Sequence, residues 1–272
     1  MDAAYGDKVT HHMYDKNAAG SSVKALDKSL LILDILANTA GEIDLSTLTK
    51  LTRIPKSTLL RLLNTLKNHN FVLQDPQSRR FRLGWALIYL GKAAEQSFDL
   101  IHVVHPYLEE LASQTGETAS LVFLDGDHAV YVDQVTSSNM IRGNPAVGSP
   151  LHLNCTSSGK ILLSAFSEQE LESFLKRTEL VKKTEKSIVD PRVLQEEVRR
   201  VRKQGYALDD EETEIGGRCA GAPVYDKEGK IVASISVVGP ATRIRQSDLV
   251  SLARLVVQTA GRASAALGFE KK

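Results

Sequence analysis

Basic residues gather in one part of the chain, between Lys50 and Arg82. This window holds eight lysine or arginine residues and one acidic residue, Asp75, so its formal charge is +7, whereas the whole chain carries +1. Ammonium and guanidinium groups bind phosphates, and arginine also binds the edge of guanine. A basic window is more often a solvated surface, so the spacing of its residues must distinguish that interpretation from nucleic-acid binding.

The spacing favours binding to duplex DNA. Pro55 is suited to the first turn of a helix, where its missing N–H costs nothing. Such a helix presents free N–H groups and the positive end of its dipole to a phosphate, and Arg61 lies on the same face as its first turn. We therefore expect DNA contacts from four residues of this helix and from two at the tip of a following hairpin: Lys56, Ser57, Thr58, Arg61, Arg79 and Arg80.

A second group of residues suited to binding follows Cys155. Hydroxyl and glycine residues at 156–159 open a predicted helix that continues with apolar residues at 161–163, and the start of a helix can bind an anion. The segment is not a Walker loop, because it has Asn154 in place of glycine and Ile161 in place of serine or threonine. An ordinary capped helix is the simpler alternative.

Acidic residues cluster further along, at 209–214. Most of them are expected to be solvated turn residues. For Asp209 we expect a polar contact with a ligand.

Two other kinds of site are conceivable. Cys155, His152 and Asp209 could form a nucleophile, a base and an orienting group, but no G-x-S-x-G or similar signature accompanies them. His102 and His105 share one face of a predicted helix and could bind a metal, but HExxH and a third spaced ligand are lacking. We expect no enzyme activity, no catalytic residues, no metal and no cofactor; a metal-responsive sensor and, less favoured, a cysteine-dependent enzyme fused to a DNA-binding domain stay open as alternatives.

Apolar periodicity predicts the elements that position the basic residues. Apolar residues at every third or fourth position predict helices from Val23, from Leu45 to about Thr52, and after Pro55. Two β-type runs, 71–73 and 81–83, flank a turn sequence. Three helices followed by a small hairpin predict a winged helix-turn-helix domain.

The second part of the chain has a different pattern. It alternates β-type runs (118–124, 129–135, 221–225, 230–238) with predicted helices (99–113, 158–165, 168–176, 191–203, 247–267). Turn sequences between the paired runs predict hairpins, and hence an α+β domain with an antiparallel sheet. We expect a mobile tail at 1–20, the winged helix-turn-helix domain at 21–84, a connector helix at 85–98 and a ligand-binding domain at 99–272.

Composition excludes several classes of protein. With 272 residues, 42% hydrophobic and 25% charged, the chain is long enough for two domains and is typical of globular proteins. No apolar run approaches the roughly 18 residues of a membrane span, and the polar start has no signal-peptide character. We expect a cytoplasmic protein without membrane contact. Its two cysteines, 64 residues apart, predict neither a disulfide framework nor a cysteine zinc site.

Six segments together resemble the IclR family of transcriptional regulators. In the first domain they are IPKSTLLRLL (54–63) and FRLG (81–84). In the second domain they are LHLNCTSSGK (151–160), GYALDDEE (205–212), GGRCAGAPV (216–224) and ISVVGP (235–240). The resemblance covers about residues 23–268. It implies a GAF-like effector domain, homodimers or dimers of dimers, a double-stranded DNA operator and control of catabolic genes by small carboxylates.

The resemblance also implies an effector site. It assigns the pocket to Met140, Gly143, Asp209, Cys219, Ser236 and Val238, and it favours a carboxylate held by the N–H groups near Ser157 and Ser158. Some family members have serine at the position of Val238, so this chain should have a drier pocket. We expect an effector with one anionic end and an apolar or aromatic body.

Overall fold

A computed structural model describes residues 23–95, 99–126 and 128–270. The chain divides into two compact units with the boundary between residues 97 and 98. We call the described residues on either side the N-terminal unit and the C-terminal unit. The expected mobile tail, 1–20, and the end of the expected connector helix, 96–98, lie outside the described residues.

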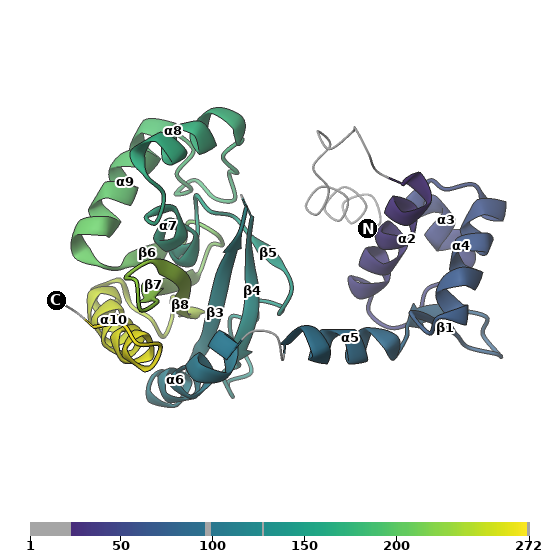
Figure 1. Ribbon diagram of the computed structural model, residues 1–272, viewed down its shortest axis with the longest axis horizontal. Coiled ribbons are helices and arrows are strands. Elements are labelled where there is room, and N and C mark those ends of the chain that lie inside the picture. Colours follow the sequence, from purple (N-terminus) through teal and green to yellow (C-terminus); the bar gives the residue numbers. More distant parts are fainter. Residues whose placement is uncertain (1–22, 96–98, 127, 271–272) are drawn as a thin grey trace. The chain divides into compact units, whose positions relative to one another are not determined.

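The N-terminal unit has the predicted winged helix-turn-helix fold (Figure 1). Its elements are α2 (Lys24–Ala37), α3 (Leu45–Thr52), α4 (Lys56–Asn68), β1 (Val72–Gln74), β2 (Phe81–Leu83) and α5 (Ala86–Glu95). Strands β1 and β2 pair in antiparallel register, and Ile43 forms a bridge to Phe81 at the outer side of β2.

Local sequence explains where α3 and α4 begin and end. The Asp44 carboxylate accepts a hydrogen bond from the Thr47 N–H at 2.9 Å and caps α3. Arg53 ends α3 in the left-handed conformation, and Pro55 precedes the first residue of α4. Leu59 and Leu63 bury one face of α4, so the opposite face of that helix is free for solvent or a partner.

Helix α5 is part of the N-terminal unit. Its Ala86 N–H donates to the Asn70 carbonyl at 3.2 Å. Gly84 makes this approach possible, because a Cβ at this position would lie 2.0 Å from the Asn70 carbonyl oxygen. The glycine of the FRLG segment therefore joins the hairpin to α5.

The C-terminal unit is built on a six-stranded sheet with neighbouring strands antiparallel, in the order β5-β4-β3-β8-β7-β6. The strands are β3 (Thr118–Asp125), β4 (His128–Val135), β5 (Pro150–Leu151), β6 (Ala207–Asp210), β7 (Gly217–Tyr225) and β8 (Ile231–Pro240). The predicted hairpins β3–β4 and β7–β8 are confirmed. The short edge strands β5 and β6 were not predicted.

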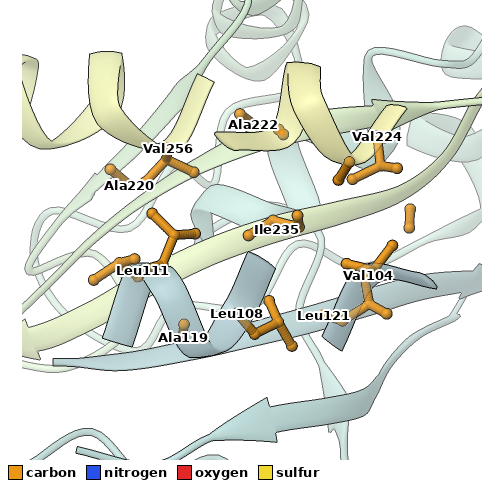
Figure 2. Packing of buried hydrophobic residues seen from close by; sticks show 14 of the residues in the cluster. Val104, Leu108, Leu111, Ala119, Leu121, Ala220, Ala222, Val224, Ile235 and Val256 are labelled. Atoms are coloured by element: carbon orange, nitrogen blue, oxygen red, sulfur yellow. The ribbon is translucent and has the colours of Figure 1, made fainter. Parts of the chain in front are cut away.

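Helices cover both faces of this sheet (Figure 1). Helices α6 (Asp99–Thr115) and α10 (Leu249–Ala266), the latter preceded by a 3-10 turn (Gln246–Asp248), pack on one face. Figure 2 shows Val104 and Leu108 of α6 meeting Leu121 and Ile235 of the sheet in this core. Helices α7 (Ser157–Leu163), α8 (Glu168–Arg177) and α9 (Pro191–Gln204) lie on the other side. No helix in the described part of the chain is long and apolar enough to cross a membrane.

Candidate DNA-binding surface and ligand cavity

The six residues predicted to contact DNA lie on α4 and at the tip of the β1–β2 hairpin. Lys56, Ser57 and Arg61 are exposed on α4, and Thr58 is half-buried. Arg79 and Arg80 are exposed at the hairpin tip. The buried leucines of α4 thus leave its basic residues on the solvent side, which is the arrangement that a groove-reading helix requires.

The basic side chains of this surface differ in whether they form ion pairs. Within residues 23–95, no ion pair forms at Lys56, Arg61, Arg79 or Arg80. Arg82 differs, because its Nε lies 3.5 Å from the Glu42 carboxylate. The four free cations are available to phosphates or base edges.

Asp75, the one acid of the basic window, is used inside the hairpin turn. Its Oδ1 accepts hydrogen bonds from the N–H groups of Gln77 at 3.0 Å and Ser78 at 2.6 Å. These bonds, with the one from Ser78 the largest cause, lower the pKa of Asp75. Arg79 follows with a positive φ of 60°. The Asp75 carboxylate is therefore hydrogen-bonded to the backbone of the turn and, within residues 75–80, it forms no ion pair with Arg79 or Arg80.

A cavity of about 240 Å³ lies in the C-terminal unit between α7 and the sheet. Seven of the eight predicted effector-binding residues line it: Gly143, Ser157, Ser158, Asp209, Cys219, Ser236 and Val238. The eighth, Met140, is not among the lining residues, and 95% of its side chain is exposed.

Strand register brings the floor of the cavity together. Val238 of β8 pairs with Cys219 of β7, which in turn pairs with Asp209 of β6. Ser236 lies two residues before Val238, on the same face of the sheet. Residues from three strands therefore form one surface although 29 positions separate Asp209 from Val238 in the sequence.

Helix α7 lies close over this floor. A Cβ at Gly221 would lie 3.1 Å from the Ser157 Oγ, so glycine permits the approach of α7 to β7. The Ser157 Oγ lies 2.8 Å from the Cys219 Sγ. Thr156 caps α7 by accepting a hydrogen bond from the Gly159 N–H at 3.0 Å. The cap fixes the two serines that face the cavity.

Asp209 has a structural role in addition to its place in the cavity wall. Its buried carboxylate accepts from the Glu212 N–H at 2.7 Å and from the Thr213 hydroxyl at 2.7 Å. Burial raises the pKa of Asp209, and the hydrogen bonds from Thr213 and Glu212 oppose that rise. Asp209 therefore shapes the loop that follows β6, and it is not a solvated turn residue.

The thiols do not favour the cysteine-enzyme alternative. Burial raises the pKa of Cys155 to about 11 and that of Cys219 to about 12. Both are protonated at neutral pH, whereas a nucleophile must be a thiolate.

The metal-sensor alternative has no support from the geometry. No group of three or more His, Cys, Asp or Glu side chains that could hold a metal occurs within residues 23–95, 99–126 and 128–270. His105 is one of the two histidines considered as metal ligands. Its Nδ1 lies 2.7 Å from the Asp133 carboxylate.

Sequence reasoning missed several lining residues, among them Tyr131, Ile141, Arg142, Thr213, Ile215 and Arg218. Alternation in the predicted strand 129–135 could have found Tyr131. The spacing of Asp209 and Thr213, typical of a side-chain-capped turn, could have found Thr213. Ile141, Arg142 and Ile215 lie in loops that carry no periodic signal, and Arg218 lies near the start of β7, before the run 221–225 that was predicted as a strand.

Comparison with known proteins agrees with both units. Residues 25–76 match the IclR helix-turn-helix domain, and residues 92–265 match the bacterial transcriptional regulator IclR C-terminal domain. This chain belongs to the IclR family. IclR-type regulators combine a DNA-binding unit with an effector-binding unit, and the resemblance found in the sequence is thereby confirmed.

Relatives of known function or structure match nearly the whole length of this chain. The HTH-type transcriptional repressor AllR of Salmonella typhi is 33% identical over 93% of both chains. The crystal structure of Thermotoga maritima IclR is 32% identical, with a TM-score of 0.76, covering 90% of this chain and 99% of that one. An IclR homologue from Microbacterium hydrocarbonoxydans complexed with 4-hydroxybenzoate shares the fold, with 18% identity, a TM-score of 0.78 and coverage of 89% and 98%.

Proposed function

We propose that this IclR-family regulator controls catabolic genes in response to a small carboxylate with an apolar or aromatic body. The observation that carries the proposal is the cavity, because it gathers seven of the eight expected residues. The six basic and hydroxyl residues on α4 and the hairpin tip are proposed to contact the operator.

The chemistry of the cavity supports this class of effector. Hydroxyl groups of Ser157, Ser158 and Ser236 line its interior, whereas Ile141 and Ile215 are exposed apolar residues at its edge. A volume of about 240 Å³ suits a small molecule with few heavy atoms. The 4-hydroxybenzoate held by the Microbacterium homologue is a molecule of this kind.

A thermal-shift screen of small organic acids, repeated with operator DNA, tests the effector class. Aromatic and partly apolar carboxylates such as 4-hydroxybenzoate should raise the unfolding temperature in a concentration-dependent manner. The shift should change when operator is present, since an effector regulates only if it binds the two states differently. Stabilisation by tiny polar acids such as glyoxylate alone would contradict the proposed class.

We further propose that the regulator acts as a homodimer or a dimer of dimers. One winged helix-turn-helix unit reads one half-site, and useful affinity requires two units spaced by about 34 Å per DNA turn. Apolar side chains support an interface on α5: Ile88 is 65% exposed and Tyr89 is 70% exposed, with Trp85 and Leu90 exposed beside them. Helix α2 adds exposed Val23, Leu26 and Leu30.

Ile88→Glu is expected to weaken dimerisation by roughly tenfold or more, because it places a charge in a desolvated apolar contact. Sedimentation velocity over a concentration series measures the effect. Val193→Glu is the matched control, since Val193 is an exposed apolar residue on α9 of the other unit. If Ile88→Glu and Val193→Glu both sediment like the unsubstituted protein, α5 does not form the interface.

A further inference from the structure

One wall of the cavity comes from the connection between β4 and β5. Residues 141–143, which we call the strap, line the cavity together with residues 213–216 of the loop that follows β6. The strap has no helix or strand structure of its own. Its position must therefore come from contacts that its backbone makes with other elements.

Arg243 holds the first residue of the strap. Its guanidinium binds both oxygens of Glu117, at 2.5 Å through Nε and 2.8 Å through Nη2. The same Nη2 donates to the Ile141 carbonyl at 2.7 Å. The Glu117 side chain is only 5% exposed, and Arg243 is the cation that pairs with it.

Thr118, the residue after Glu117, holds the other end of the strap. Its hydroxyl donates to the Gly143 carbonyl at 2.6 Å and accepts from the Ser137 N–H at 3.1 Å. Gly143 lies directly on Val238 of the cavity floor, and a Cβ at Gly143 would be 2.7 Å from the Val238 Cγ1. The strap is thus fixed at both of its ends.

Glu117 itself lies against the floor of the cavity. A Cβ at Gly239, a lining residue, would be 2.6 Å from the Glu117 carboxyl carbon. Position 239 accommodates the buried Glu117 carboxylate because it has no side chain. The Glu117–Arg243 pair therefore connects the floor of the cavity to the strap.

We propose that Arg243 is a positioning residue of the cavity: by binding Glu117 and the Ile141 carbonyl together, it sets the wall that restricts entry to the site above Cys219. Neither Glu117 nor Arg243 was assigned to the site from the sequence, and Arg243 is not among the lining residues. Only one part of this inference rests on the proposed function, namely that the molecule that enters the cavity is the effector.

Cys219 provides a test that needs no effector. Of the two cysteines, Cys219 lines the cavity, whereas Cys155 is completely buried and is not among the lining residues. Alkylation of each thiol by excess iodoacetamide is followed over hours at pH 9 in the full-length protein by peptide mass spectrometry, because only the thiolate fraction of each cysteine reacts. In Arg243→Gln, alkylation of Cys219 should be faster by on the order of tenfold, because opening of the strap no longer breaks a charge-assisted hydrogen bond.

Two further variants separate positioning from general stability. Arg262→Gln is the matched control, since Arg262 pairs with Glu110 at 2.6 Å between α10 and α6, on the other face of the sheet. It should leave alkylation of Cys219 near the unsubstituted rate. Arg243→Lys keeps the charge beside Glu117 but loses the fork that also reaches Ile141, so it should fold normally and still expose Cys219.

The outcomes distinguish the inference from its alternatives. Faster alkylation of Cys219 in Arg243→Lys, with Cys155 unchanged, supports it even if Arg243→Gln fails to fold. An unchanged Cys219 rate in folded Arg243→Lys and Arg243→Gln overturns it, as does an equal rise at Cys155 or in Arg262→Gln. Failure of every organic acid to bind would overturn the proposed effector class and leave the alkylation result standing.

Discussion

Replacement of Lys160 by methionine is expected to lower the free energy of unfolding of the C-terminal unit by about 3–5 kcal/mol. The Lys160 side chain is 1% exposed, and its Nζ lies 2.6 Å from Glu212 and 3.7 Å from Glu197. Without the cation, the buried Glu212 carboxylate loses its ion-pair partner, whereas Glu197 keeps its ion pair with Arg200. Calorimetry of the full chain measures the change, and Trp85, the one tryptophan, reports separately on the N-terminal unit.

The destabilisation should depend on pH. Burial raises the pKa of Glu212 to about 7, and Lys160 opposes that rise. The pKa of Glu212 in the folded state exceeds its ordinary value, so protonated Glu212 contributes to the stability of the fold below the pKa of the unfolded state. This contribution is lost as the pH rises through about 7. Removal of Lys160 raises the pKa further, so the cost of Lys160→Met should be larger at pH 8 than at pH 5.

Two variants control this experiment. Lys186→Met removes an exposed lysine that pairs with Asp210 at the end of β6 and with Glu211 in the loop that follows, and it should leave the free energy of unfolding nearly unchanged. Adding Glu212→Gln to Lys160→Met should recover part of the loss, since no buried charge is then left at position 212. A loss of less than ~1 kcal/mol in Lys160→Met at pH 8 would contradict a stabilising role for the buried pair.

Arg61→Ala is expected to weaken operator binding by ~1–3 kcal/mol if Arg61 contacts a base. Arg61 is exposed on the face of α4 opposite Leu59 and Leu63 and forms no ion pair among the described residues. Fluorescence anisotropy at several salt concentrations measures the loss. A base contact predicts relaxed sequence preference, whereas a phosphate contact predicts a salt slope smaller by about 1.

Lys176→Ala controls for the change in net charge. Lys176 is an exposed lysine of α8 in the other unit, paired with Glu172, and its removal should leave operator affinity within the error of the measurement. Effector-induced thermal shifts should be unchanged in both variants. Equal operator affinity of Arg61→Ala and the unsubstituted protein would remove α4 from the proposed interface.

The elements with strong local signals were predictable from the sequence. Asp190 and Pro191 followed by apolar residues at helical spacing predicted the helix at 191–203, and the structure has α9 at Pro191–Gln204. Strand β6 was not predicted because its sequence, ALDD, resembles an acidic turn; it exists through pairing with β7. Local periodicity does not indicate which distant segments pair.

The same limit applies to the cavity. The family resemblance implied seven residues that the structure brings together, but it also implied Met140, which lies in an exposed loop. Lys160 was expected only as part of a segment that could bind an anion. Its partners Glu212 and Glu197 are 52 and 37 positions away, so only the packing of α7, α9 and the loop after β6 reveals that the cation is already used.

The affinity of the full chain for a duplex selected from a random pool, measured against a scrambled duplex at physiological salt, shows whether this protein recognises a DNA sequence. We expect one sequence to be enriched and to be bound on the order of 10³-fold or more tightly than the scrambled duplex. We also expect this ratio to fall in Arg61→Ala. Enrichment of no sequence, with equal affinity for both duplexes, would contradict a regulator that reads DNA through α4.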